Sequence, residues 1–184
     1  QGYIKRTALN TYRTQRRGGR GVQGAMSKDE DFVEHLFIAN THNYMLFFTD
    51  MGKCYWLKVY DIPQGGRAAR GRAIVNLIGC DPGERVEAFV SVKDFDDDHY
   101  IVMCTKNGIV KKTVLSAYGN PRKGGIYAID IRDNDKLIEA RITNGEHDIL
   151  LGTHEGKSIR FSENNIRPSG RKTMGVKGIT LSSS

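Results

Sequence analysis

The chain has 184 residues, of which 39% are hydrophobic, and this is enough for the packed core of one or two ordinary domains. It carries 28 Lys and Arg residues against 21 Asp and Glu residues, and no apolar run approaches the roughly 18 residues of a membrane span. The start has no signal-peptide pattern, so we expect a cytoplasmic protein without a membrane partner. Three widely spaced cysteines without a Cys-x-x-Cys pair, Cys54, Cys80 and Cys104, indicate free thiols rather than disulfides or a zinc site.

The first distinctive segment in chain order is the run 15–21, which reads QRRGGRG. Arginine resists burial unless it is paired, no acidic residue precedes Asp29, and glycine destabilises the interior of a helix or strand. The run therefore predicts a solvent-facing loop, whose guanidinium and backbone N–H groups match phosphate oxygens. The alternative is a flexible basic linker that contacts nothing. The candidate phosphate-binding residues of this loop are Gln15, Arg16, Arg17, Gly18, Gly19, Arg20 and Gly21.

The charge of the chain is unevenly distributed. Residues 1–28 contain seven Lys and Arg residues and no acid, whereas residues 29–184 contain 21 residues of each sign. A solvated surface normally mixes both signs. The basic block beside a balanced body therefore indicates a docking site for an anionic partner, and nucleic acid is the partner that fits best.

A repeated turn follows along the chain. Glycines recur at intervals of about 50 residues, and around the last three the pattern is an apolar run, a threonine, two turn residues, the glycine and a second run. Because glycine tolerates the positive φ of hairpin turns, this pattern predicts β-hairpins. The turn glycines are Gly2, Gly52, Gly108 and Gly156, and the first strands of the three complete hairpins are expected at 44–49, 100–105 and 148–153.

A second glycine marks each repeat, followed by a short apolar stretch and a last strand. These glycines are Gly24, Gly71, Gly125 and Gly178, and the last strands are expected at Phe32–Asn40, Val86–Val92 and Leu137–Ile142. Three or four strands per 50 residues predict an all-β, propeller-like array of four-stranded antiparallel blades, with approximate boundaries 1–40, 41–92, 93–144 and 145–184. A two-domain sandwich is the alternative. No strand precedes Gly2 and none closes the last unit, so we expect part of a longer array or missing segments.

Cations recur in phase with the repeat. Equivalent positions of a repeat occupy equivalent places in the structure, so these residues predict one basic band around a rim, whereas ordinary solvated loops would mix both signs. Such a band binds the DNA backbone without base readout and bends the duplex. Its expected DNA-binding residues are Lys5, Arg6, Arg67, Arg70, Arg72, Lys111, Lys112, Arg122, Lys123, Arg160, Arg171 and Lys172.

The run 15–21 resembles the gyrase-A box, which distinguishes the C-terminal domain of the DNA gyrase A subunit from that of topoisomerase IV. The resemblance covers essentially the whole chain, through the segments 2–6, 21–24, 31–37 and 47–49. It implies a β-pinwheel, in which neighbouring blades exchange strands. The family usually has six blades, so this chain is incomplete at about three and a half. Arg20 stands where Lys is also common, which keeps the charge.

The resemblance also implies a function. The family wraps double-stranded DNA around its basic perimeter with positive handedness, and so presents a second duplex segment to the cleavage core of the enzyme. Strand passage then introduces negative supercoils. The implied partners are the rest of the gyrase A subunit and the gyrase B subunit, in an A2B2 heterotetramer. ATP and Mg belong to that holoenzyme, a type IIA topoisomerase, and this chain is expected to hold no cofactor.

The sequence shows no catalytic or metal-binding constellation. The run Asp96–His99 consists of consecutive residues, which do not converge on one ion as spaced ligands do, and no Walker-type phosphate loop is present. We therefore expect a non-catalytic domain. Two alternatives remain: the equivalent domain of a topoisomerase IV-like enzyme, and a propeller that binds proteins. Salt separates the latter from DNA binding, since only DNA affinity falls by orders of magnitude at high salt.

Overall fold

The computed structural model describes residues 2–12, 14–21 and 33–181. Short strands dominate these residues, with one helix of a single turn and four 3-10 turns. The elements are β1 (Tyr3–Ile4), η1 (Leu9–Thr11), β2 (Tyr44–Thr49), β3 (Lys53–Lys58), η2 (Val59–Asp61), β4 (Arg72–Ala73), α1 (Ile74–Ile78), β5 (Val86–Val92), β6 (Tyr100–Thr105), β7 (Ile109–Val114), η3 (Leu115–Tyr118), β8 (Ile126–Tyr127), β9 (Leu137–Thr143), β10 (Asp148–Gly152), β11 (Ser158–Ser162), η4 (Glu163–Asn165) and β12 (Val176–Lys177).

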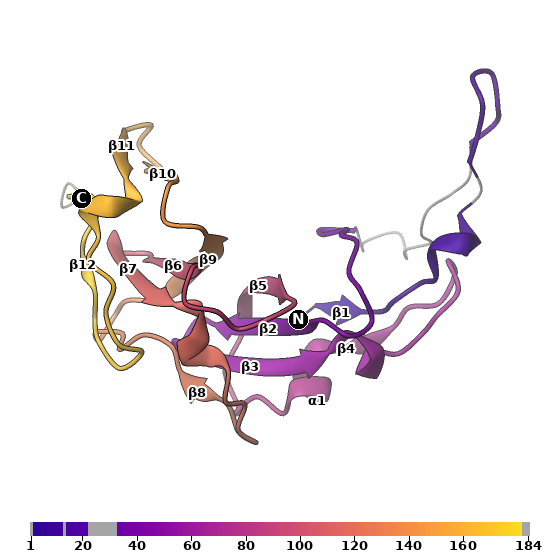
Figure 1. Ribbon diagram of the computed structural model, residues 1–184, viewed down its shortest axis with the longest axis horizontal. Coiled ribbons are helices and arrows are strands. Elements are labelled where there is room, and N and C mark those ends of the chain that lie inside the picture. Colours follow the sequence, from indigo (N-terminus) through magenta and orange to yellow (C-terminus); the bar gives the residue numbers. More distant parts are fainter. Residues whose placement is uncertain (1, 13, 22–32, 182–184) are drawn as a thin grey trace.

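The strands form two four-stranded antiparallel sheets and two smaller ones. The larger sheets have the orders β5-β2-β3-β8 and β9-β6-β7-β12, and the two-stranded sheets pair β1 with β4 and β10 with β11. Figure 1 shows these sheets following one another along an open arc, with β5 and β9 toward its concave side and β8 and β12 toward its convex side. The predicted all-β array of antiparallel blades is confirmed.

The threonine and glycine of the repeat are explained by the hairpin turns. In the β2–β3 hairpin, the Gly52 N–H donates to the Thr49 carbonyl at 2.9 Å, and the Lys53 N–H donates to the Thr49 hydroxyl at 3.2 Å. Gly52 has a φ of 79°, which disfavours any residue with a Cβ. The same two bonds and the same φ recur in the other hairpins, at Thr105 with Gly108 and at Thr153 with Gly156.

The sheets exchange strands. β8 follows β7 in the chain but pairs with β3 of the preceding sheet, β12 follows β11 but pairs with β7, and β4 follows β3 but pairs with β1. We call the crossing segments 62–73, 119–127 and 168–177 the arms. The loop of each arm ends at a glycine of positive φ, and these glycines are Gly71, Gly125 and Gly175. Each packs so closely against a strand that an added Cβ would lie 2.4 to 3.0 Å from a backbone carbonyl oxygen.

Two expectations about the last part of each repeat are wrong. The arm glycine of the last unit is Gly175 rather than Gly178, whose N–H donates to the Gly108 carbonyl as the Ala128 N–H does to Gly52. Gly24 lies outside the described residues. No strand forms over residues 33–40, because no other described segment pairs with their backbone; Phe32 also lies outside the described residues.

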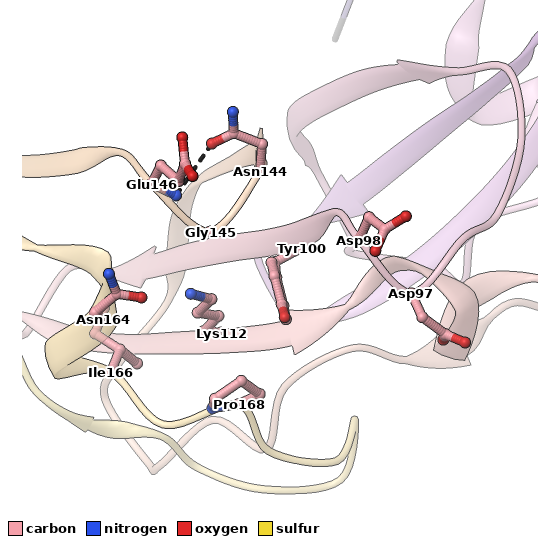
Figure 2. A pocket seen from close by; sticks show the side chains of 10 residues that line it. All are labelled: Asp97, Asp98, Tyr100, Lys112, Asn144, Gly145, Glu146, Asn164, Ile166 and Pro168. Carbon is pink, nitrogen blue, oxygen red and sulfur yellow. Dashed lines mark hydrogen bonds between the residues drawn. The ribbon is translucent and has the colours of Figure 1, made fainter.

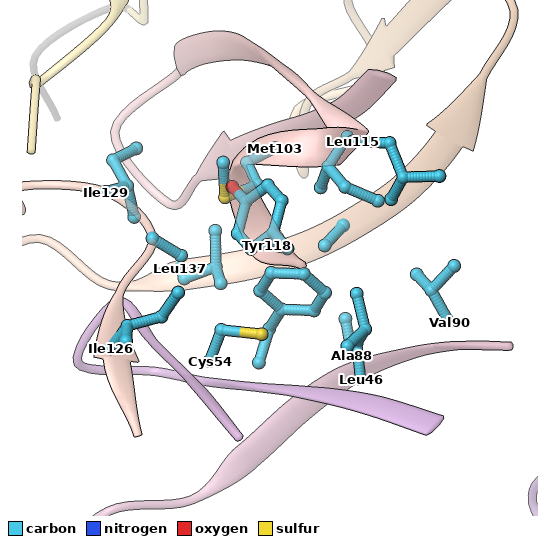
Figure 3. Close-up of a cluster of buried hydrophobic side chains, with 14 of the residues drawn as sticks. Leu46, Cys54, Ala88, Val90, Met103, Leu115, Tyr118, Ile126, Ile129 and Leu137 are labelled. Atoms are coloured by element: carbon cyan, nitrogen blue, oxygen red, sulfur yellow. The ribbon is translucent and has the colours of Figure 1, made fainter. Parts of the chain in front are cut away.

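The core lies between successive sheets. One cluster of buried side chains joins the two larger sheets and includes Leu46, Cys54, Tyr118 and Leu137 (Figure 3). A second cluster packs the β2–β3 hairpin against the first unit. All three cysteines are free thiols, of which Cys54 is buried, and burial raises the pKa of its thiol. Among the described residues, no helix has the length and apolar character needed to cross a membrane.

Candidate nucleic-acid interface

The arginine–glycine run forms an exposed loop at one end of the arc. Residues 14–21 are all solvent-exposed, as predicted, and Figure 1 shows this segment projecting away from the sheets. The Gly19 N–H donates to the Arg16 carbonyl at 2.9 Å, and Gly18 has a φ of 86°, so the residues 16–19 form a turn with glycine at its third position. A Cβ on Gly19 would lie 2.7 Å from the Gln15 side-chain oxygen. The turn therefore presents its arginines at an exposed tip.

We call the run 15–21 the box. The segment that precedes it lies along the first arm. The Arg6 N–H donates to the Pro63 carbonyl at 3.0 Å, and the Gly65 N–H donates to the Arg6 carbonyl at 3.0 Å. The Arg6 guanidinium donates to the carbonyls of Ile62 at 2.9 Å and Tyr60 at 3.2 Å. Arg6 is half-buried, so most of its donors serve the protein itself. The segment that leads to the box is thus bound to the first arm.

Two residues expected on the basic rim are buried instead. Lys111 and Lys112 are 0% and 3% exposed, because β7 is an inner strand of its sheet and successive side chains point toward opposite neighbours. Lys111 faces the preceding unit, where its ammonium donates to the Ala128 carbonyl at 2.5 Å. Lys112 faces the following unit, where it pairs with Glu163 at 2.8 Å. The expectation that these lysines lie on an exposed rim is wrong.

The two buried lysines have different electrostatic surroundings. Burial, with the nearby Arg171 guanidinium, lowers the pKa of Lys111 to about 7. The pKa of Glu163 is lowered: its burial acts to raise it, but the hydrogen bonds from Lys112, the His147 N–H and Thr143 outweigh the effect of burial. The ammonium of Lys112 also lies 4.2 Å from the centre of the Tyr100 ring. Lys112 is therefore part of a charged contact between units.

A polar cavity of about 450 Å³ lies beside this contact. Figure 2 shows Tyr100 and Lys112 on the strands at its floor, with Asn144 and Glu146 on one side and Asn164 on the other. Three carboxylates, Asp97, Asp98 and Glu146, line it, and the side chain of Lys112 is only 4% exposed. Such a lining repels phosphate, so the cavity does not belong to a nucleic-acid interface.

Arg160 also differs from the expectation. It lies on β11, away from the arms, and its guanidinium donates through Nε to Asp148 on β10 at 2.8 Å and through a second nitrogen to the same carboxylate oxygen. Arg160 is exposed, but its charge is balanced across the hairpin. It adds little net charge to a basic surface.

The arms carry the remaining predicted cations. They contain no acidic residue, and their Lys and Arg residues are Arg67, Arg70, Arg72, Arg122, Lys123, Arg171, Lys172 and Lys177. Arg67 and Arg171 are half-buried and the other six are exposed. Within the described part of the chain, no carboxylate forms an ion pair with Arg72, Arg122, Lys123 or Lys172. Each arm thus places net positive charge at the outer edge of a sheet.

Two arm arginines contact neighbouring segments. The Arg171 guanidinium donates to the Tyr127 carbonyl at 3.3 Å, which joins the last arm to the middle arm. The Arg70 guanidinium lies 4.2 Å from the centre of the Tyr3 ring, on the segment that leads to the box. In Figure 1 the three arms lie along the convex side of the arc, and the box projects from the same end as the first arm. The box and most of the arm cations are therefore exposed, whereas Lys111 and Lys112 face inward and the exposed Arg160 is paired on its own hairpin.

The run Asp96–His99 forms hydrogen bonds within a surface loop. Asp96 and His99 contact each other through the Asp96 carboxylate and His99 Nδ1 at 2.9 Å, and Ser116 donates to Asp97. In the described ranges, no group of three or more His, Cys, Asp or Glu side chains is arranged to hold a metal ion. The hydrogen bonds of the Asp96–His99 run are those of a capped surface loop.

The chain matches a known family over nearly its whole length. The profile described as "DNA gyrase C-terminal domain, beta-propeller" matches residues 1–40, 43–93, 99–144 and 147–183. The DNA gyrase A subunit of Clostridium acetobutylicum is 53% identical over 96% of the chain, and that of Halalkalibacterium halodurans is 47% identical over 97%. The chain spans about a fifth of the length of these curated relatives, 21% and 22% respectively.

Solved structures share the architecture. The C-terminal domain of DNA topoisomerase IV superimposes with a TM-score of 0.82 at 31% identity, covering 99% of this chain and 55% of that one. A DNA gyrase A C-terminal domain superimposes with a TM-score of 0.74 at 25% identity, covering 99% and 58%. The resemblance inferred from the sequence is confirmed: the chain belongs to the family of DNA gyrase A C-terminal domains, and its strand-exchanged array is a β-pinwheel.

Proposed function

We propose that this chain binds double-stranded DNA along its arms and its box, and wraps it for a DNA gyrase. The observation that carries the proposal is the set of three structurally equivalent arms, which together hold eight cations and no acid on the convex side of the arc. A curved row of cations follows the phosphate backbone of a bent duplex. The exposed box at the end of the row adds three further arginines, Arg16, Arg17 and Arg20.

The mode of binding follows from the residue types. Exposed guanidinium and ammonium groups on glycine-rich loops neutralise phosphates, but they do not form the ordered surface that reads base edges. Affinity is then dominated by counterion release and falls with salt by about 0.9 log units per log unit of salt for each phosphate contacted. Bending a short duplex along the arc costs roughly 1–6 kcal/mol, which the additional contacts offset.

DNA cleavage and ATP hydrolysis take place in other parts of the enzyme. DNA cleavage, ATP and Mg are supplied by the remainder of the gyrase A subunit and by the gyrase B subunit in an A2B2 holoenzyme, and this chain contributes the wrap. A wrapped duplex presents a second segment of the same molecule to the cleavage core, so strand passage introduces negative supercoils. Relaxation does not require this geometry.

The box provides the direct test. Replacing Arg16, Arg17 and Arg20 with Ala in the reconstituted holoenzyme should abolish ATP-dependent supercoiling and the linking-number shift of nicked circles that are religated with the enzyme bound. ATP-dependent relaxation should persist. The matched control replaces three exposed cations outside the box and arms, Lys93, Lys106 and Arg132, with the same change in net charge. Equal loss in both variants, or supercoiling retained by the box variant, contradicts the proposal.

A further inference from the structure

Two lysines at equivalent positions of the repeat bind backbone carbonyls of the arms. Lys5 and Lys111 both lie three residues after a turn glycine. Lys111 Nζ donates to the Arg171 carbonyl of the last arm at 2.6 Å and to the Ala128 carbonyl at 2.5 Å. Lys5 Nζ donates to three carbonyls of the first arm, those of Gly66 at 3.0 Å, Arg67 at 2.8 Å and Ala69 at 2.7 Å.

These contacts exclude a direct role in phosphate binding. A lysine ammonium has three donors, and Lys5 uses all three on one arm. Lys111 is fully buried within β7, out of reach of a ligand on the surface. Both side chains therefore act on the arms and not on a bound polyanion.

We propose that Lys5 and Lys111 are positioning residues for DNA binding, which hold the loops of the first and last arms in place before DNA arrives. The inference rests on the function proposed above and names the residues that prepare its binding surface. Each of these loops is rich in glycine and in like charges, so its own sequence favours an open, mobile chain. An ammonium that binds its carbonyls ties the loop to β7 in the case of Lys111, and to the residue that follows β1 in the case of Lys5.

The middle arm is an internal comparison, because tyrosine replaces lysine at its position. The Tyr55 hydroxyl donates to the buried Glu84 at 2.6 Å and contacts no carbonyl of the arm. The arm is held by packing instead, since a Cβ on Gly125 would lie 2.8 Å from the Tyr55 ring. Just before the same arm, the Trp56 indole N–H donates to the carbonyl of Tyr118, the last residue of η3, at 2.9 Å. Lys111 binds the Ala128 carbonyl just after this arm but no carbonyl of the loop 119–125, so changes at Lys111 should leave that loop unaltered.

The consequence for binding concerns both affinity and its salt dependence. An arm that is ordered in advance does not add an ordering cost when DNA binds. Loss of the holding lysine should therefore weaken binding about three- to tenfold at every salt concentration, while the arm cations still meet their phosphates. The slope of log affinity against log salt should stay unchanged. Loss of a phosphate contact should instead lower that slope by about 0.9.

The test combines amide hydrogen exchange of the free chain with DNA titrations at several salt concentrations. Lys111→Met, which keeps the apolar stem, should raise exchange in residues 168–177 about tenfold and leave residues 119–125 unchanged. The matched control Lys172→Met removes an exposed cation from the same arm. It should leave exchange unchanged and lower the salt slope by about 0.9.

The half-buried Lys5 gives a second variant should Lys111→Met unfold the chain. Lys5→Met should raise exchange in residues 62–71 alone. Unchanged exchange with a lowered slope would assign the lysine to phosphate binding, and exchange raised equally over all sheets would assign it to general stability. Either result overturns the inference. An unaltered chain that binds DNA without salt dependence would instead refute the proposed function, and the exchange results would stand apart from it.

Discussion

The buried pair of Lys112 and Glu163 makes a sharp prediction about stability. Their charged atoms lie 2.8 Å apart, and the two side chains are 4% and 0% exposed. Glu163 also accepts hydrogen bonds from the Thr143 hydroxyl and the His147 N–H, both at 2.8 Å. In the preceding unit, Leu115 occupies the position equivalent to Glu163. The Leu115 N–H donates to the His99 carbonyl, as the Glu163 N–H does to the His147 carbonyl. The pair thus replaces an apolar contact between units.

Replacing Lys112 with Met should destabilise the chain strongly. The substitution leaves the Glu163 carboxylate buried without its countercharge, a change that costs about 3–5 kcal/mol. For a chain of this size each kcal/mol lowers the melting temperature by about 2–4 °C, so the midpoint should fall by about 10 °C. Urea and thermal unfolding can be followed by the fluorescence of Trp56, the only tryptophan, which packs against the core.

The loss should depend on pH. Without Lys112, burial should raise the folded-state pKa of Glu163 above its unfolded value of about 4.5, so the folded state binds the proton more tightly. The deficit is then fully present at neutral pH and shrinks as pH falls toward 5. Adding Glu163→Gln to Lys112→Met should restore much of the stability at pH 7 and remove the pH dependence. The neutral amide oxygen still accepts from the His147 N–H, and the amide NH2 donates to the Thr143 hydroxyl.

An exposed cation should behave in the opposite way. Lys123→Met should change the unfolding free energy by no more than about 0.5 kcal/mol and lower the salt slope of DNA binding by about 0.9. If Lys112→Met gave that same pattern, with stability preserved and the salt slope reduced, the side chain would be contacting DNA. The reasoning from burial would then be refuted.

Two further predictions concern the arms. Gly175→Ala should lower the unfolding free energy by about 3 kcal/mol, because φ is +87° there and the new Cβ would lie 2.4 Å from the Val110 carbonyl oxygen. Thermal unfolding measures the loss. The control Gly170→Ala, in open space at an ordinary φ, should leave stability unchanged. Burial and Arg171 lower the pKa of Lys111 to about 7. Above pH 7 this side chain therefore binds fewer protons in the folded chain than in the unfolded chain. The unfolding free energy should therefore gain about 1.5 kcal/mol from this group between pH 7 and 8.5, and urea titrations of Lys111→Met should lack that gain.

The hairpins could be predicted from the sequence because their chemistry is local. Thr49 and Gly52 lie three residues apart, and the same two residue types satisfy the same turn bonds in every hairpin. The composition of the arms was equally informative, since segments that contain several glycines and cations and no acidic residue do not form a buried element. Local patterns of this kind depend on neighbours in the chain, which a single sequence contains.

The burial of Lys111 and Lys112 could not be predicted in the same way. A pair of lysines ordinarily indicates an exposed position, and their partners Arg171 and Glu163 lie 60 and 51 residues further along the chain. The exchange of strands depends equally on distant pairing, such as Cys54 with Ile126. It was expected from the resemblance to a family and not from any spacing.

The exchange of strands also accounts for where the arm cations lie. An arm must leave its own hairpin and reach the free edge of the preceding sheet, so its loop always passes over the outside of the array. A loop in that position is exposed whatever residues it contains, and its backbone is fixed by the glycine that lies on the strand carbonyl. Cations placed there are therefore repeated once per unit at a spacing that the sheets determine. The path of a bound duplex would then be set by the stacking of the blades, and changes in the contacts between blades, such as the Lys112–Glu163 pair, should alter DNA bending without removing a single DNA contact.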